Sequence, residues 1–292
     1  MTRVRGRFAP TPSGLLHFGS LVAAIASYLN AKSRGGQWLI RIDDLDSDRN
    51  VQGASEDILK TLEKFGLFWD GNVLYQSDQI DIYNDAIDEL SREELIYPCI
   101  CTRKKIGNNP YSGTCRTRLY SSTTTSSLRM ITENKILKFH DVKQGIFKQN
   151  IEKEVGDFIV KRSDGYIAYH LANVVDDQIQ GITEVVRGAD LLDSTPRQIY
   201  LQKKLGYSQP EYLHLPVAVD QEGLKLSKSN GSLAIKNSSA PQNRSELICN
   251  SLSFLGQSPP ESLKMENVDV CIEWGISNWN VSKIPELSSK EY

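Results

Sequence analysis

Residues 7–20 read RFAPTPSGLLHFGS and place two prolines, two glycines and the first histidine of the chain between two structured runs. The run VRGRFA predicts a strand before this loop, and SLVAAIASYLNAKSRGG predicts a helix after it, which two glycines end. His17 and Ser20 stand where the helix begins, and the free N–H groups there favour an anion. A phosphate-binding loop and an ordinary strand-to-helix connection with a capping serine both explain this stretch on its own.

The next apolar run, WLIRID at residues 38–43, predicts a second buried strand. Strand, loop, helix and strand in this order form a βαβ unit, which implies a parallel sheet with a right-handed crossover. Ligands of such sheets bind at the carboxyl ends of the strands. We therefore expect an α/β fold in which the quoted loop and the carboxylates of RIDDLD lie at the functional edge.

The pattern of strands and helices continues along the chain. ASEDILKTLEKFGL and DIYNDAIDELSREEL predict helices that frame a strand VLYQS, and a later helix is expected from Arg244 to Leu255. DFIVKRSDGYIAYHL predicts two strands around an Asp-Gly turn, and GITEVVRGADLL followed by TPRQIYLQKKLG predicts a strand and a helix. The polar, aperiodic residues 117–127 predict a flexible surface segment within an insertion.

The composition is that of a folded protein of enzyme size. The 292 residues include 39% hydrophobic and 24% charged residues, which is enough for one large or two modest domains. No apolar stretch approaches the roughly 20 residues that span a bilayer, and the start MTRVRGRF lacks the apolar core of a secretory signal. We expect a cytoplasmic protein without a membrane partner.

Charge is unevenly distributed although the net charge is only −2. Residues 40–94 hold fifteen acidic and five basic side chains, whereas residues 99–138 hold eight Lys or Arg and one Glu. The second segment suits a polyanion, and a solvated basic face is the competing interpretation.

Three of the five cysteines lie within CICTRKKIGNNPYSGTC, residues 99–115. An odd count with this crowding is a poor disulfide framework and favours a metal site. Zinc takes four ligands, and chemistry alone offers His140 or a water for the fourth position. Three reduced cysteines without a metal remain the alternative, because C-x-C is less diagnostic than paired C-x-x-C.

A second loop, LKLSKSNGS at residues 224–232, places Lys225 and Lys228 on either side of a serine. Two such cations could clamp a triphosphate, with Lys228 near the transferring phosphate. Taken alone, a solvated surface loop is the simpler interpretation.

Read together, HFGS at 17–20 and KLSKS at 225–229 resemble the HIGH and KMSKS motifs of class I aminoacyl-tRNA synthetases. The longer strings RFAPTPSGLLHFGSL, RIDDLD, AYHLANVVDD, ITEVVRGADLL and STPRQIYLQKKLG are similar to the glutamyl branch of that class. Only about sixty residues follow residue 232, where a full glutamyl-tRNA synthetase would need a helical anticodon-binding region. The short chain therefore most resembles the truncated branch that acts on queuosine in tRNA(Asp).

This resemblance implies a Rossmann-type parallel-sheet catalytic domain with an inserted zinc-binding subdomain and a short C-terminal extension. Residues 1–98 and 157–236 would be its two halves, 99–156 the insertion, and 237–292 a helical extension without an anticodon-binding domain. The implied reaction is ATP-dependent activation of L-glutamate to glutamyl-adenylate without tRNA, then transfer to the queuosine base at the wobble position of tRNA(Asp). Mg²⁺ would accompany ATP, and we expect a monomer. The alternatives are a short glutamyl-tRNA synthetase that charges a tRNA 3′ end, and a non-catalytic ATP- or RNA-binding paralogue.

The resemblance also implies roles for single residues. The implied catalytic residues are His17, Ser20, Lys225 and Lys228. The implied ATP-binding residues are His17, Gly19 and Lys228. The implied glutamate-binding residues are Arg7, Phe8, Ala9, Pro10, Thr11, Asp43, Tyr169 and Arg187. The implied zinc ligands are Cys99, Cys101, Tyr111 and Cys115.

In this pattern Arg7 and Arg187 would hold the glutamate carboxylates, because planar guanidinium groups suit them. Asp43 would bind the substrate ammonium, although it is one methylene shorter than the Glu of the family and needs a closer backbone or a bridging water. Lone histidines are more often structural, so His140, His170 and His214 receive no catalytic role.

Overall fold

The computed structural model describes residues 3–107, 109–118, 125–219, 235 and 241–291. Its centre holds two groups of parallel strands. The first is β1 (Arg5–Phe8), β2 (Gln37–Ile42) and β3 (Leu74–Tyr75), and the second includes β9 (Glu184–Gly188) and β10 (Glu211–Leu215). β2 pairs with β1 and β3, and β9 pairs with β10, all in parallel. The N–H of Thr183 donates to the Arg5 carbonyl at 3.0 Å and brings β9 beside β1. The hydrogen-bonded orders are therefore β1-β2-β3 and β10-β9, with β9 lying beside β1, and these parallel pairs confirm the predicted α/β fold with a parallel sheet.

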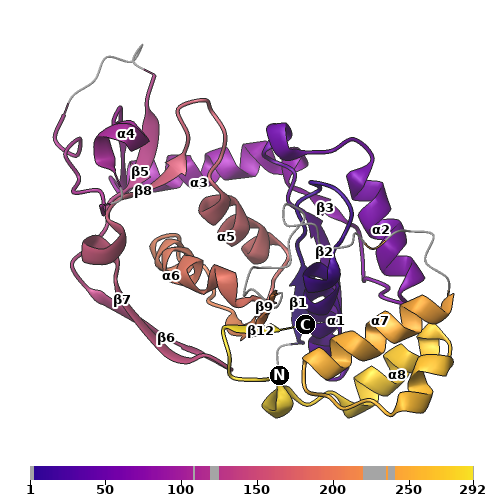
Figure 1. Ribbon diagram of the computed structural model, residues 1–292. Coiled ribbons are helices and arrows are strands. Elements are labelled where there is room, and N and C mark those ends of the chain that lie inside the picture. Colours follow the sequence, from indigo (N-terminus) through magenta and orange to yellow (C-terminus); the bar gives the residue numbers. More distant parts are fainter. Residues whose placement is uncertain (1–2, 108, 119–124, 220–234, 236–240, 292) are drawn as a thin grey trace.

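Helices cover both faces of this sheet (Figure 1). On one side lie α1 (Phe18–Lys32), α7 (Pro241–Phe254) and α8 (Val268–Asn278), with α2 (Ala54–Lys64) at their edge. On the other side lie α3 (Ile80–Arg92), α5 (Tyr169–Ile179) and α6 (Thr195–Lys204). The helices predicted for residues 54–67, 81–95 and 195–206 are confirmed within a few residues at each end.

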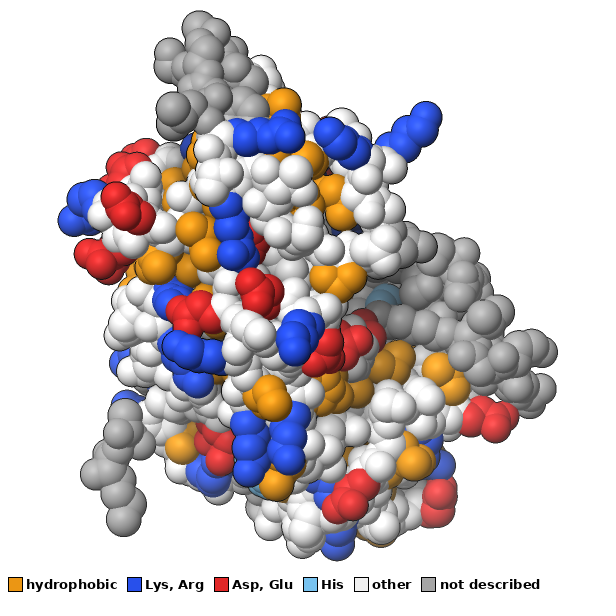
Figure 2. Space-filling view, turned by 90° about the vertical axis from the view of Figure 1, so that its left-hand side faces the viewer, with side chains coloured by type: hydrophobic (Ala, Val, Ile, Leu, Met, Phe, Trp, Pro, Cys, Tyr) orange, Lys and Arg blue, Asp and Glu red, His pale blue; other side chains and the backbone are white. Residues whose placement is uncertain are grey.

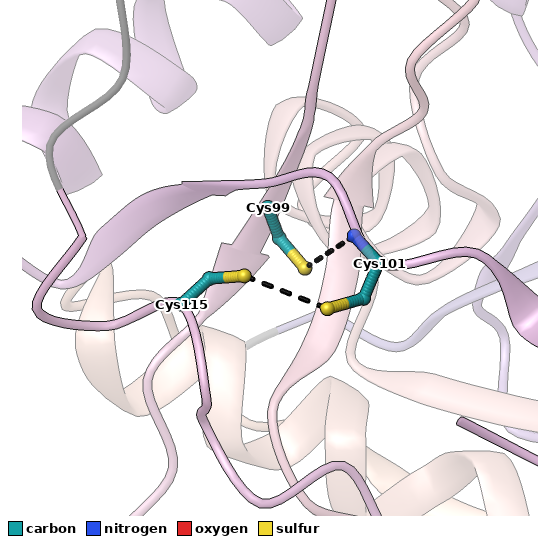
Figure 3. Close-up of side chains that lie close together, drawn as sticks. All are labelled: Cys99, Cys101 and Cys115. Atoms are coloured by element: carbon teal, nitrogen blue, oxygen red, sulfur yellow. Dashed lines mark hydrogen bonds between the residues drawn. The ribbon is translucent and has the colours of Figure 1, made fainter. Parts of the chain in front are cut away.

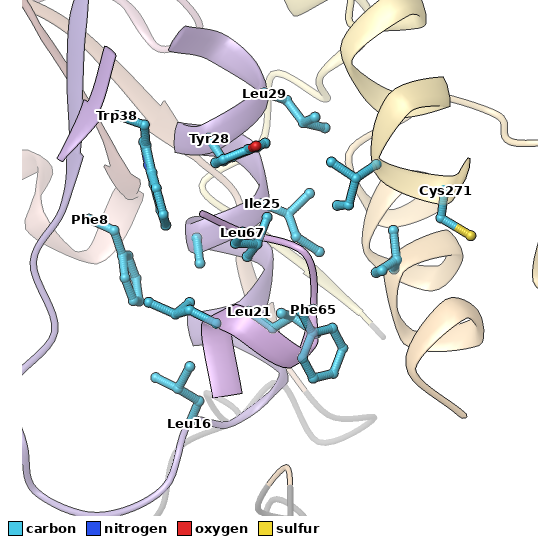
Figure 4. Packing of buried hydrophobic residues seen from close by; sticks show 14 of the residues in the cluster. Phe8, Leu16, Leu21, Ile25, Tyr28, Leu29, Trp38, Phe65, Leu67 and Cys271 are labelled. Atoms are coloured by element: carbon cyan, nitrogen blue, oxygen red, sulfur yellow. The ribbon is translucent and has the colours of Figure 1, made fainter. Parts of the chain in front are cut away.

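The core between α1 and the sheet explains why this first βαβ unit forms. Leu21, Ile25 and Leu29 recur at helical spacing on α1 and are fully buried against the sheet and α8 (Figure 4). Trp38 of β2 is also fully buried, stacks on Phe8 with ring centroids 6.4 Å apart, and is one of the largest side chains of the cluster. Burial of each such side chain contributes about 1.5–3 kcal/mol, so this cluster fixes the position of the loop between β1 and α1.

A smaller part of the chain leaves the parallel sheet and returns to it. An antiparallel sheet is formed by β4 (Ile96–Cys99), β5 (Ser127–Met130) and β8 (Phe158–Lys161), with α4 (Arg103–Ile106) beside it. A hairpin of β6 (Ile136–Asp141) and β7 (Gly145–Asn150) follows, and β6 lies beside β10. Strands β11 (Val217–Val219) and β12 (Ser289–Glu291) form a separate parallel pair. Short helical turns complete the chain, over Ser47–Arg49, Gln76–Gln79, Ile151–Val155, Ala189–Ser194, Glu261–Met265 and Val281–Lys283.

The prediction of two strands around the Asp-Gly turn at residues 157–171 is wrong for its second strand. β8 forms, and Gly165 makes the turn with φ 94°, but only a single bridge joins Lys161 to Ile167. α5 begins at Tyr169 because Leu171, Val174 and Val175 are buried at helical spacing. Periodicity of 3.6 over the longer segment therefore outweighs the local hairpin signal.

Two further predictions need adjustment. The segment predicted to be flexible, 117–127, includes residues 119–124, which lie outside the described residues, while Ser127 already begins β5. The helix expected from Arg244 begins earlier, at Pro241, and ends at Phe254. Within the described residues, no helix combines the length and apolar character needed to cross a membrane.

Candidate active site

A cavity of about 730 Å³ opens at the carboxyl ends of β1, β2 and β9. It is lined by residues from five separate parts of the chain, within 7–23, 43–49, 169–173, 186–191 and 215–218, which the fold brings together. Its lining includes Arg7, Phe8, Ala9, Pro10, Thr11, His17, Gly19, Ser20, Asp43, Tyr169 and Arg187. Lys225 and Lys228 lie outside the described residues.

The loop between β1 and α1 is held in place by backbone hydrogen bonds. The N–H of Asp43 donates to the Pro10 carbonyl at 3.0 Å, which ties the loop to the end of β2. Gly14 has φ 123°, a backbone conformation that residues other than glycine rarely adopt. The residue that caps α1 is His17, whose Nδ1 accepts the Ser20 N–H at 3.3 Å. The cap is therefore the histidine and not the serine of the alternative interpretation.

Charged side chains gather beneath this loop. Arg7 donates through Nε to Asp177 at 3.2 Å, and Arg41 donates to Asp43 and Asp177 at 2.7 Å each. Arg41 is fully buried, and Arg7, Asp43 and Asp177 are buried as well. The cluster of Arg7, Arg41, Asp43, Asp176 and Asp177, hereafter the charge cluster, carries a net charge of −1 when all groups are ionised.

The carboxylates of the charge cluster differ in their acidity. Burial raises the pKa of Asp43 above its ordinary value, despite the contact with Arg41. Burial also raises the pKa of Asp176 to about 6, although Tyr83 and Gln76 each donate to it at 2.7 Å. The pKa of Asp177 is instead lowered, because Arg7 and Arg41 outweigh its burial. The cluster therefore holds more negative charge than its own cations stabilise well, a situation that an added cation would relieve.

Arg187, at the end of β9, is the second arginine that lines the cavity. Its NH2 group donates to Thr195 Oγ1 at 2.9 Å and to Gln198 Oε1 at 2.8 Å, and its Nε donates to His214 Nε2 at 3.1 Å. Its NH1 atom is buried and has no hydrogen-bond partner among the described residues. Leaving a buried charged donor unpaired costs more than about 1–3 kcal/mol, so this atom is suited to an anionic ligand. Tyr169 lines the same cavity and is 39% exposed.

Sequence reasoning missed several members of this site. Arg41, Asp176 and Asp177 belong to the strings RIDDLD and VVDD, whose charged residues in otherwise apolar runs were the available signal. His214 received no role, yet it is fully buried against Arg187. No signal in the sequence alone links residue 214 to residue 187, because strand pairing of β9 with β10 creates the contact.

The three cysteines of residues 99–115 meet at one point (Figure 3). Their sulfur atoms all lie within 4.8 Å of one another, and Cys101 and Cys115 are 3.5 Å apart. The Tyr111 hydroxyl lies 3.3 Å from Cys99 Sγ and 3.4 Å from Cys101 Sγ. His140, the alternative fourth ligand, is exposed on β6 and is no part of this group.

These four donor atoms fit a tetrahedral ion. Zinc with Zn–S bonds of about 2.3 Å separates its sulfur ligands by about 3.8 Å, close to the spacing observed. Arg129 lies against the group, with Nε donating to Cys99 Sγ at 3.2 Å and its guanidinium 4.2 Å from the centre of the Tyr111 ring. A buried cation beside thiolates stabilises their charge.

Only some of the basic side chains around these cysteines are exposed at the surface. Arg103, Lys104, Lys105 and Arg118 are exposed, but Arg116 is half-buried in an ion pair with Asp157 at 2.6 Å. Figure 2 shows the side of the molecule on which α4, β6 and β7 lie, and its Lys and Arg side chains are mixed with Asp and Glu. The charge of Arg116 is therefore already paired within the fold, unlike the four exposed cations.

Comparison with known proteins agrees with this geometry. Residues 3–281 match the family model for the catalytic domain of class I tRNA synthetases (E and Q), and the chain belongs to this family of ligases. Curated relatives are named glutamyl-Q tRNA(Asp) synthetase. The relative from Pseudomonas fluorescens is 46% identical over 97% of this chain and 94% of its own length, and that from Dechloromonas aromatica is 47% identical over 97% and 96%.

A solved structure gives the same result for the fold. The glutamate-tRNA synthetase from Elizabethkingia anophelis superposes with a TM-score of 0.81 and 26% identity. The match covers 99% of this chain and 68% of that chain. The resemblance read from the sequence motifs is therefore confirmed.

Proposed function

We propose that this chain activates L-glutamate with ATP, without tRNA, and then transfers the glutamate to the queuosine base at the wobble position of a tRNA(Asp). The observation that carries the proposal is a cavity lined by Arg187, whose guanidinium has no ion-pair partner in the described part of the chain, and by Arg7 and Asp43 of the negative charge cluster. Glutamate has two carboxylates and one ammonium. The carboxylates complement the arginines that line the cavity, and the ammonium complements the negative charge cluster. The names of the curated relatives support the choice of substrate and tRNA.

Each part of the amino acid has a complementary partner. Arg7 is held by Asp177 through Nε, which leaves its other nitrogens for one carboxylate, and Arg187 offers NH1 to the other. Asp43 lines the cavity and would take the ammonium, which neutralises the excess charge of the cluster. Phe8, Ala9, Pro10, Thr11 and Tyr169 would form the remaining wall.

ATP would bind where α1 begins. His17, Gly19 and Ser20 line the cavity there, and the helix N-terminus favours phosphate. A glutamate carboxylate oxygen would attack the α-phosphorus of ATP and displace pyrophosphate, and Mg²⁺ bound to the phosphates would neutralise part of their charge. Lys225 and Lys228 would stabilise the phosphate charge as it develops. In the second step a hydroxyl of the modified base attacks the activated carbonyl and AMP leaves.

The cysteine group is proposed to hold one structural zinc ion through Cys99, Cys101, Tyr111 and Cys115. All four positions are filled by the protein, so the ion would pin residues 99–156, the proposed insertion, and take no part in the reaction. The proposed halves of the catalytic domain are then 1–98 and 157–236, with 237–292 as the C-terminal extension. A monomer in the cytoplasm completes the proposal.

Replacing Cys115 with serine is expected to remove zinc and to destabilise the protein, since a structural zinc ion contributes folding free energy directly. The purified protein should contain about one zinc ion per chain by elemental analysis, and the variant should contain almost none. Cys249→Ser is the matched control, because this buried cysteine lies in the core beside α1 and away from the group. Equal zinc content in both variants would contradict the assignment.

The proposed transfer is tested by locating labelled glutamate on tRNA(Asp) after ribonuclease digestion. Label on the anticodon fragment of queuosine-containing tRNA, and none on tRNA that lacks queuosine, is the expected result. Label on the 3′-terminal adenosine would instead support a short glutamyl-tRNA synthetase. Absence of label on both would support a non-catalytic binding protein.

A further inference from the structure

Arg187 differs from the other arginines of the site in the charge of its partners. Arg7 and Arg41 form ion pairs with aspartates, whereas every hydrogen-bond acceptor of Arg187 is formally neutral: a hydroxyl, an amide, a carbonyl and an imidazole. No ion pair with Arg187 occurs in the described part of the chain. Its positive charge is therefore uncancelled and is left for a ligand.

The imidazole among these partners is itself held by a carboxylate. His214 Nδ1 lies 2.5 Å from Asp141 Oδ2, and both side chains are fully buried. Asp141 also accepts the backbone N–H groups of Lys143 and Gln144 at 3.0 and 2.9 Å. This carboxylate is therefore fixed by β6 and the turn after it, and a fixed carboxylate selects the tautomer that carries its proton on Nδ1.

We propose that Asp141 and His214 form a positioning relay that orients Arg187 while keeping its charge available for a substrate carboxylate. This inference rests on the proposed role of Arg187 in glutamate binding. With the proton on Nδ1 donated to Asp141, the Nε2 lone pair accepts from Arg187 Nε at 3.1 Å. A carboxylate placed directly on Arg187 would orient it equally well but would cancel the charge that the ligand needs.

The acid–base behaviour of the pair agrees with this arrangement. Burial, together with the nearby guanidinium of Arg187, lowers the pKa of His214 and favours the neutral ring despite the contact with Asp141. Burial opposes ionisation of Asp141, but the contact with His214 and the backbone N–H groups of Gln144 and Lys143 together outweigh it and hold the pKa of Asp141 below its ordinary value. A neutral imidazole beside an ionised carboxylate is the state in which Nε2 can accept.

The relay also connects separate parts of the fold. Asp141 ends β6 in the segment between the two halves of the parallel sheet, His214 lies on β10, and Arg187 lies on β9. Thr195 and Gln198 of α6 fix the NH2 group of the same guanidinium. With Nε and NH2 held in this way, the plane of the guanidinium is set, and so is the direction of NH1.

Two substitutions of His214 distinguish a role in orienting Arg187 from a role in stabilising the fold alone. Asparagine places an amide near the former Nδ1, so it can bond Asp141 but cannot reach Arg187. Glutamine places its amide oxygen near the former Nε2, so it can accept from Arg187 but loses Asp141. His214→Asn is expected to raise the KM for glutamate about tenfold, with the KM for ATP and kcat nearly unchanged, because one hydrogen bond that orients Arg187 is lost. His214→Gln should recover most of this loss.

The matched control is His140→Asn, since His140 is exposed on the same strand as Asp141 and should change neither constant. The relay would be overturned if the KM for glutamate were higher in His214→Gln than in His214→Asn. It would also be overturned if both variants kept the wild-type KM for glutamate. Nitrogen-15 NMR of the histidine rings tests the relay without any substrate. A proton on Nδ1 of His214 is expected, and a proton on Nε2 would overturn the relay. The expected tautomer in a protein without glutamate-dependent activity would instead refute the proposed function and leave the relay standing.

Discussion

Replacing Arg187 with alanine is expected to lower kcat/KM for glutamate about 100-fold in glutamate-dependent ATP–pyrophosphate exchange. Arg187 lines the cavity, its buried NH1 atom has no hydrogen-bond partner among the described residues, and a hydrogen bond from a charged donor to a carboxylate is worth about 1.5–3 kcal/mol. Loss of the uncancelled charge adds to this, and each 1.4 kcal/mol corresponds to a factor of ten. The KM for ATP should change little, since the phosphates are expected at the start of α1.

Arg5→Ala is the matched control for this measurement. Arg5 lies on β1 of the same sheet but is exposed and donates to Gln37 at 2.9 Å, outside the cavity. Arg187→Lys should recover only part of the activity, because an ammonium cannot reproduce the planar fork held by Thr195 and His214. An Arg187→Ala variant with a wild-type KM for glutamate would contradict the assigned role.

Replacing Arg41 with alanine is expected to lower the free energy of unfolding by about 3–5 kcal/mol at neutral pH. Arg41 is fully buried and contacts Asp43, Asp176 and Asp177, so its loss leaves buried carboxylates without their main cation. The pKa values of Asp43 and Asp176, which are already raised, would then rise further, and the lowered pKa of Asp177 would rise as well. A group with a raised pKa in the folded state stabilises the fold at low pH and loses this contribution as pH rises. The defect should therefore be smaller near pH 4 than at pH 7.

Urea denaturation at several pH values measures this effect. Arg162→Ala is a suitable control, because its ion pair with Asp164 is exposed and is expected to contribute less than about 1 kcal/mol. A loss of stability in Arg41→Ala that is equal at pH 4 and pH 7 would indicate a simple packing defect and would contradict the electrostatic explanation.

The first βαβ unit was predictable because local signals and burial agree there. The helical spacing of Leu21, Ile25 and Leu29 and the apolar run around Trp38 each specify one element without help from distant residues. The second strand proposed near Ile167 failed because packing of α5 against the sheet outweighs the local turn signal. Tertiary context decides such segments, and a single sequence does not contain it.

The candidate site was predictable only where it coincides with family motifs. Those strings supply Arg7, Asp43 and Arg187, and the strand order then brings the three to one cavity. The contacts that adjust these residues depend on pairs such as Arg41 with Asp177, 136 positions apart, and Asp141 with His214, 73 positions apart. Such pairs arise from the topology of the sheet, so spacing along the chain gives no sign of them.

The central claim is that this cavity activates glutamate by itself, and amino-acid-dependent ATP–pyrophosphate exchange without tRNA tests it most directly. The measurement is made on the purified protein with Mg²⁺ and ATP, across all twenty amino acids. Exchange with L-glutamate alone is the predicted result, because glutamate presents one carboxylate each for Arg7 and Arg187 and an ammonium for Asp43, which line the same cavity. No exchange with glutamate, or equal exchange with glutamine, would contradict the account.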